Sequence, residues 1–101
     1  MAGVVLNADC QIGDNVIVNT GATVDHDVRV ESDVHIAPGC HISGYVSIGR
    51  GTLIGTGSSV KDRVHIGERA TIGAGAAVYR DVPNYATVVG SQMRAVEHPE
   101  S

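Results

Sequence analysis

The chain has no phenylalanine and no tryptophan, and it has only three tyrosines among its 101 residues. An aromatic cluster therefore cannot form its core, which must be built from valine and isoleucine. It also lacks a basic block, and its formal net charge of −4 at pH 7 argues against nucleic acid as the main partner. No long apolar run and no signal sequence occur, so we predict a cytoplasmic protein outside the membrane.

A branched aliphatic residue stands at every sixth position from Leu6 to Val78. The set is Leu6, Ile12, Val18, Val24, Val30, Ile36, Ile42, Ile48, Ile54, Val60, Ile66, Ile72 and Val78. This period excludes an α-helix of 3.6 residues per turn, and it excludes a meander with turns of variable length. It indicates a solenoid of hexapeptide repeats.

A second periodic position lies two residues before each aliphatic residue and holds small or medium side chains. Residues two apart in a strand point the same way, so both positions enter the interior. Glycine, asparagine and aspartate are common between them and favour tight corners. We predict an all-β parallel β-helix with triangular coils of about eighteen residues, about four of them between Leu6 and Val78. Cys10 and Cys40 fall at inward positions on different sides of the coil, which predicts reduced packing residues and no disulfide.

Two groups of motifs carry a resemblance to a known family. Residues 48–76 contain repeated Ile-Gly pairs, and residues 18–27 read VNTGATVDHD. Residues 34–39 then read VHIAPG, and the segments DVP at 81–83 and VVG at 88–90 follow. Over residues 10–90 the chain resembles the left-handed parallel β-helix acyltransferases. Within them it is similar to the bacterial nucleotide-aminosugar N-acetyltransferases and the related sialic acid O-acetyltransferases.

The resemblance implies an acetyl-CoA-dependent enzyme that transfers acetyl to the amine of a nucleotide-linked amino sugar. His26 would be the general base, because imidazole can accept a proton near neutral pH, and Asp27 would orient it. The backbone N–H of Gly44, one coil above, would stabilise the thioester oxygen. The family's equivalent of Asp27 is commonly glutamate, which leaves the reach of the shorter side chain open.

The resemblance also implies a set of residues that contact acetyl-CoA. They are His35, Asn19, Thr56 and Ala74. An all-glycine column lies beside the last two: Gly3, Gly21, Gly39, Gly57 and Gly75. Glycine there suits a turn with positive φ, and it also suits a wall without Cβ atoms along which a long ligand can lie. Both interpretations can hold together.

Two departures from the family bear on the division of the chain. The family usually carries an α/β domain for the nucleotide sugar ahead of the β-helix, whereas only residues 1–5 precede the first hexad here. We therefore expect a catalytic-domain fragment or a stand-alone relative. Residues 91–93 read Ser-Gln-Met where the family tends to have Asn-Pro-Ala. We predict an N-terminal start at 1–5, a β-helix at 6–83 and a cap with a frayed tail at 84–101.

Outward mid-strand residues eighteen apart form three columns, one on each face of the prism. The first contains Gln11, Arg29, Ser47 and His65, the second Val5, Thr23, His41, Ser59 and Ala77, and the third Ile17, His35, Leu53 and Thr71. The first is polar and suits water. The other two are small or apolar, and we predict that they face neighbouring subunits of a homotrimer.

His26 and His35 are nine residues apart, which is half a coil, so they lie on opposite sides of one prism. One acetyl group cannot touch both residues of the same chain. If both act in one site, His26 of one subunit must meet His35 of the next, with acetyl-CoA between them. His41 then suits packing or an interchain hydrogen bond, and His65 and His98 suit surface positions.

Two other function classes remain open. A γ-type carbonic anhydrase shares the trimeric β-helix and binds zinc through three histidines, but the spacing of His35 and His41 does not resemble its ligand set, so we predict no metal. A non-catalytic trimer that lacks its nucleotide-sugar domain is the second alternative. Acceptors other than a nucleotide-linked amino sugar, including sialic acid hydroxyls, also remain open.

Overall fold

The computed structural model describes residues 5–6, 9–90 and 94–97 of the chain. Every regular element in this part of the chain is a strand, and most strands are only two residues long. They are β1 (Val5–Leu6), β2 (Gln11–Ile12), β3 (Ile17–Val18), β4 (Thr23–Val24), β5 (Arg29–Val30), β6 (His35–Ile36), β7 (His41–Ile42), β8 (Ser47–Ile48), β9 (Leu53–Ile54), β10 (Ser59–Val60), β11 (His65–Ile66), β12 (Thr71–Ile72), β13 (Ala77–Val78), β14 (Ala86–Val89) and β15 (Arg94–Glu97).

The strands form three sheets, which are the three faces of a prism. The His41 face contains β1, β4, β7, β10 and β13, and the Arg29 face contains β2, β5, β8 and β11. The His35 face contains β3, β6, β9, β12, β14 and β15. Partner residues are eighteen apart, as in the parallel pair of Thr23 with His41 and the pair of His35 with Leu53. The predicted eighteen-residue coil and its three columns are confirmed.

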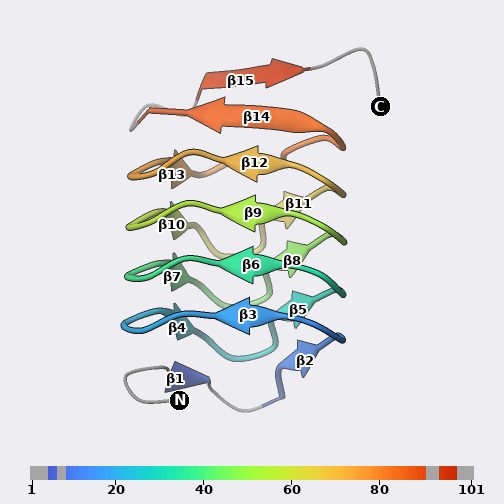
Figure 1. Ribbon diagram of the computed structural model, residues 1–101, viewed down its shortest axis with the longest axis vertical. Coiled ribbons are helices and arrows are strands. Elements are labelled where there is room, and N and C mark those ends of the chain that lie inside the picture. The colour runs from blue at the N-terminus through green and yellow to red at the C-terminus, as the bar shows by residue number, and fades with distance from the viewer. Residues whose placement is uncertain (1–4, 7–8, 91–93, 98–101) are drawn as a thin grey trace.

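The coil is left-handed. In Figure 1 the strands β3, β6, β9 and β12 run leftward across the front, while the chain climbs from the N-terminus at the bottom and returns behind through β4 and β5. This hand is opposite to that of the usual crossover between parallel strands. The left-handed β-helix implied by the family resemblance is therefore confirmed.

The core is a set of aliphatic ladders inside the prism. From Val24 to Val78 every sixth residue is at most 1% exposed. Each such side chain contributes about 1.5–3 kcal/mol when it is fully removed from water. Thr52 and Ser58 are the polar residues at inward positions, and each donates its hydroxyl hydrogen to a carbonyl oxygen of the next coil at 2.8 Å. Those hydrogen bonds allow hydroxyl groups to lie in an otherwise apolar interior.

Both cysteines are free, as predicted. The Cys10 thiol donates to the carbonyl oxygen of Asp25 at 2.9 Å, and the Cys40 thiol donates to that of Gly55 at 3.0 Å. Burial raises the pKa of the Cys40 thiol above its usual value. Cys40 therefore packs as a neutral thiol in the core.

Positive φ recurs at the third residue of the corners. At the corner between the His35 and His41 faces, which we call the glycine corner, Gly21, Gly39, Gly57 and Gly75 have φ between 70° and 77°. The predicted conformational requirement of this column is confirmed for these four glycines, and Gly3 lies outside the described residues. At the corner between the His41 and Arg29 faces, which we call the Tyr45 corner, the same position is filled by larger residues. They are Asp9, Asp27, Tyr45 and Arg63, with φ between 58° and 63°.

The C-terminal end departs from the hexad. Thr71 pairs with Thr87, so the last step on the His35 face takes sixteen residues in place of eighteen. The four-residue strand β14 then pairs antiparallel with β15. Within residues 84–101, for which the sequence pattern predicted a cap and a frayed tail, Arg94–Glu97 forms a strand on the His35 face. Residues 91–93 and 98–101, where the rest of the predicted tail falls, lie outside the described residues.

Candidate functional site

The first half of the candidate site lies at the Tyr45 corner. His26 is the second residue of its turn, and its backbone N–H donates to the Asp25 carboxylate at 2.9 Å. The His26 Nδ1 atom lies 3.2 Å from Asp27 Oδ2, so the shorter aspartate does reach the ring. When Asp27 accepts the Nδ1 proton, the lone pair of His26 is left on Nε2. The His26 side chain is 52% exposed, so part of the ring is open to solvent.

Gly44 lies directly over the imidazole. A Cβ atom added to Gly44 would lie 3.1 Å from His26 Cε1 and 3.2 Å from Nε2, so only a glycine lets the ring lie this close. Within the described residues the Gly44 N–H has no hydrogen-bond acceptor, whereas its carbonyl accepts from Arg63 N–H at 3.0 Å. A proton acceptor and an unused backbone donor therefore lie side by side.

The second half lies on the His35 face. His35 Nε2 is 2.7 Å from Asn19 Nδ2, and the same amide also donates to the carbonyl oxygen of Ile36 at 3.3 Å. With the Asn19 amide as donor, His35 Nε2 is the acceptor of this hydrogen bond. The two predicted residues are thus brought together, with the exposed His35 ring held by Asn19.

Thr56 and Ala74 lie at the glycine corner, two and three coils above Asn19. The Thr56 carbonyl accepts from Gly75 N–H at 2.8 Å, while the N–H groups of Thr56 and Ala74 find no acceptor within the described part of the chain. Added Cβ atoms at Gly57 and Gly75 would meet nothing within 4 Å. The corner is therefore an open wall with two unused backbone donors.

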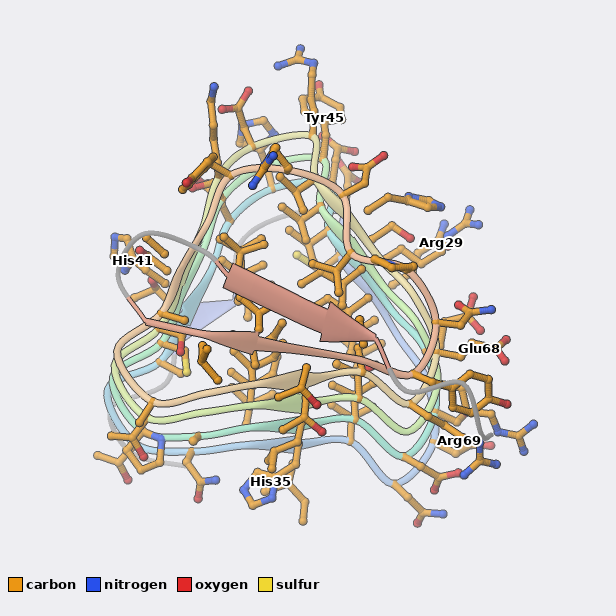
Figure 2. All side chains as sticks on the ribbon, turned by 90° about the horizontal axis from the view of Figure 1, so that it is seen from above. Arg29, His35, His41, Tyr45, Glu68 and Arg69 are labelled. Atoms are coloured by element: carbon orange, nitrogen blue, oxygen red, sulfur yellow. The ribbon has the colours of Figure 1, made fainter. Side chains whose placement is uncertain are left out.

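The two halves lie on opposite sides of one prism. Figure 2 shows Tyr45, which contacts His26, at the apex and His35 on the face opposite to it. Two surface hollows of about 300 and 210 Å³ lie on the Arg29 face, and neither is lined by a predicted site residue. One chain therefore carries the two groups of candidate residues as two separate half-sites.

The other described histidines lie elsewhere. His41 Nδ1 is 2.6 Å from the Thr23 hydroxyl on the His41 face, within one chain. The exposed His65 lies on the Arg29 face, as predicted. Among the described residues, no three His, Cys, Asp or Glu side chains lie close enough together to hold a metal ion. His98 lies outside the described residues.

Tyr45 is a further residue of the candidate site, and the sequence pattern did not reveal it. Its ring packs edge-to-face against His26, with 5.2 Å between ring centroids and 87° between planes. The available signal was the eighteen-residue spacing, which puts Tyr45 directly above Asp27 and Arg63 above Tyr45. No helix in the described part of the chain is long and apolar enough to cross a membrane.

Comparison with known proteins identifies the class. Residues 9–44 and 45–80 match the family described as bacterial transferase hexapeptide (six repeats). The matched segments make up more than half of the chain, which therefore belongs to this family of hexapeptide-repeat transferases. A search of curated protein sequences finds no significant match.

Solved structures show which hexapeptide-repeat proteins this chain resembles. A single-residue variant of perosamine N-acetyltransferase from Caulobacter crescentus, in complex with CoA and GDP-perosamine, is 40% identical with a TM-score of 0.94, over 97% of this chain and 47% of that one. The acetyltransferase domain of PglB from Neisseria gonorrhoeae is 34% identical with a TM-score of 0.86, over 94% and 55% of the two chains. Serine acetyltransferase from Neisseria gonorrhoeae is 28% identical with a TM-score of 0.89, over 98% and 43%. This chain thus spans about half the length of these relatives.

Proposed function

We propose that this chain is the catalytic β-helix of an acetyl-CoA-dependent N-acetyltransferase that acts on the amine of a nucleotide-linked amino sugar. The observation that carries the proposal is the cluster at the Tyr45 corner. There, His26 has a carboxylate on Nδ1 and the unused Gly44 N–H beside its other edge. The relative with 40% identity, solved with CoA and GDP-perosamine, supports both the cosubstrate and the acceptor class. The PglB domain, solved also with acetyl coenzyme A, supports the cosubstrate.

The chemistry follows from these positions. The acceptor nitrogen attacks the thioester carbonyl while His26 Nε2 takes its proton, a step for which a general base contributes about 10²–10⁴-fold. The carbonyl oxygen becomes an oxyanion, which the Gly44 N–H stabilises. The C–S bond then breaks, and the protonated imidazole returns the proton to the leaving CoA thiolate. Asp27 stabilises the imidazolium between these steps.

The proposed site is completed by a second chain in a homotrimer. His35, Asn19, Thr56 and Ala74 of the neighbour would line the acetyl-CoA side, because they lie on the side of the prism away from His26. The unused N–H groups of Thr56 and Ala74 suit the amide carbonyls of the pantetheine arm. The His35 face also exposes Ile17 by 48% and Leu53 by 40%, which favours burial against another subunit.

O-acetyl transfer is the second candidate, and the 28% identity to serine acetyltransferase favours it. A hydroxyl acceptor, including a sialic acid hydroxyl, needs the same general base and oxyanion donor. The acceptor alone therefore separates the two reactions. A non-catalytic scaffold is distinguished from both, because it need not bind acetyl-CoA.

The experiment measures CoA thiol release from acetyl-CoA with GDP- and UDP-linked amino sugars, sialic acid and serine as acceptors. We expect turnover with a nucleotide-linked amino sugar. We expect His26→Ala to lower kcat by about 10²–10⁴-fold while calorimetry shows unchanged acetyl-CoA binding. Near-normal kcat in His26→Ala contradicts the assignment of the base. Absence of acetyl-CoA binding by the wild-type chain contradicts the proposed function as a whole.

A further inference from the structure

Tyr45 contacts His26 through both its backbone and its side chain. Its N–H donates to the His26 carbonyl oxygen at 3.2 Å, which ties the two corners together between consecutive coils. Its ring then meets the imidazole edge-to-face at 5.2 Å, a geometry in which two aromatic rings attract each other. The imidazole is therefore in contact with Gly44 on the coil above, with Asp27 at Nδ1 and with the Tyr45 ring.

Arg63 restrains the Tyr45 ring from the next coil. The guanidinium carbon of Arg63 lies 4.9 Å from the centroid of the Tyr45 ring, within the range of a cation–π contact. Arg63 Nη1 also donates to Asp62 Oδ2 at 3.0 Å, which limits how far the guanidinium can swing away. Three successive coils thus build a stack of His26, Tyr45 and Arg63 along the corner.

The turn itself does not call for a tyrosine. Residue 45 has a φ of 60°, a left-handed conformation that a bulky side chain rarely adopts and that glycine or asparagine adopts readily. The ring is also half exposed, so it contributes little to the aliphatic core. A strained and exposed aromatic residue beside the proposed base points to a role in the site.

We propose that Tyr45 is a positioning residue that holds the His26 imidazole in the orientation needed for proton transfer. The proposal rests on the proposed role of His26 as the base. Because the His26 side chain is half exposed, Asp27 alone leaves the ring free to tilt about the Nδ1 contact. The Tyr45 ring removes that freedom, so that Nε2 stays beside Gly44. Its loss should lower kcat and leave the KM for acetyl-CoA unchanged, since the proposed acetyl-CoA contacts lie on the other half of the site.

The test uses the full chain with Tyr45→Gly, Tyr45→Phe and the control Tyr85→Gly. Tyr85 has a φ of 64° and an equivalent backbone hydrogen bond at the corner on the far side of the Arg29 face, so the control removes a tyrosine from the same kind of turn. Histidine-labelled protein reports the mobility of the His26 ring by NMR relaxation, and steady-state kinetics report kcat and KM. Loss of the ring and relief of the positive φ oppose each other in stability, so Tyr45→Gly should remain folded.

We expect Tyr45→Gly to increase the mobility of the His26 ring and to lower kcat by about two- to tenfold, with Tyr45→Phe and Tyr85→Gly both close to wild type. Unchanged ring mobility and kcat in Tyr45→Gly overturn the proposal. A loss in Tyr45→Phe equal to that in Tyr45→Gly also overturns it, because the ring is then not the active part. The NMR result needs no turnover. If the wild-type chain transfers no acetyl group, the proposed function fails, while the NMR result still decides whether Tyr45 holds the ring.

Discussion

Substitution of Gly44 by alanine should move the His26 ring and leave the other groups of the candidate site in place. The new Cβ would lie 3.1 Å from His26 Cε1, 3.2 Å from Nε2 and 3.3 Å from the His26 carbonyl oxygen. Ordinary contacts between heavy atoms are about 3.5–4.0 Å, so the neighbours must move by about 0.3–0.5 Å. The imidazole side chain is half exposed and can tilt outward, whereas the backbone is held in the coil.

The expected result is a stable variant with a lower rate of the proposed reaction. Gly44 has no positive φ, so alanine adds no backbone strain, and the lower entropy of the unfolded chain offsets part of the crowding. A displacement of about 1 Å can cost about 10²-fold in rate, so a few tenths of an ångström should lower kcat by about three- to tenfold. The variant keeps the Gly44 N–H, so the loss would report displacement of the proposed base and not the absence of the proposed oxyanion donor.

Gly49→Ala is the matched control. Its Cβ would meet the Gly67 backbone carbon at 2.5 Å and Glu68 N at 2.6 Å, on another corner away from His26. We expect Gly49→Ala to lower stability by about 1–3 kcal/mol in urea denaturation and to keep its kcat while folded. If Gly44→Ala has wild-type kcat, or if it loses as much stability as Gly49→Ala, the reasoning about this contact is refuted.

Three further predictions address the core, the glycine corner and the buried thiol. Thr52→Val removes the hydrogen bonds to the partly buried Gly67 carbonyl and the buried Ala70 N–H. It should lower the free energy of unfolding by about 2–4 kcal/mol in urea denaturation, and a loss below about 0.5 kcal/mol contradicts this. Gly57 and Gly51 both have positive φ, so replacing either by alanine should lower the free energy of unfolding by about 1 kcal/mol. Only Gly57→Ala should weaken acetyl-CoA binding in calorimetry. If both variants bind acetyl-CoA equally well, the glycines of this column serve only the geometry of the turn. Because burial raises the pKa of Cys40 above its unfolded value of 9.0, its contribution to stability is complete below pH 9 and is lost as the pH rises further. Cys40→Ala should remove that part of the alkaline slope in denaturation measured at several pH values.

The sequence predicts the columns of this fold with little ambiguity. A six-residue period repeated from Leu6 to Val78 predicts which side chains enter the core, and those from Val18 to Val78 are buried, whereas Ile12 near the N-terminal end of the prism is 38% exposed. Eighteen-residue coils also place Gly44 above His26 without any knowledge of side-chain angles. The period changes after Val78, where one step takes sixteen residues. Beyond that point the six-residue period no longer predicts the structure, so the antiparallel strand β15 was not predicted.

The chemistry of the corners depends on side-chain torsions, which spacing does not determine. Asp27 directly follows His26 in the sequence, but only the side-chain conformation brings its Oδ2 atom to 3.2 Å from His26 Nδ1. The same limit explains the missed contact of Tyr45, since a residue in a turn can point its ring along the corner or into water. The contact of His35 with Asn19 at 2.7 Å likewise depends on side-chain torsions, and the sequence could suggest it only through the family resemblance.

Activity in mixed trimers tests the proposed sharing of the site between subunits most directly. His26→Ala and His35→Ala chains are each expected to be inactive alone. When they are unfolded together, refolded in equal amounts and verified as mixed trimers, an interface is intact if His26 of one chain meets His35 of the next. Each mixed trimer has one intact interface of three, and random assembly makes about three quarters of the trimers mixed, so about a quarter of wild-type activity should return in the whole preparation. If both variants are inactive alone and verified mixed trimers stay inactive, the site is not shared between subunits.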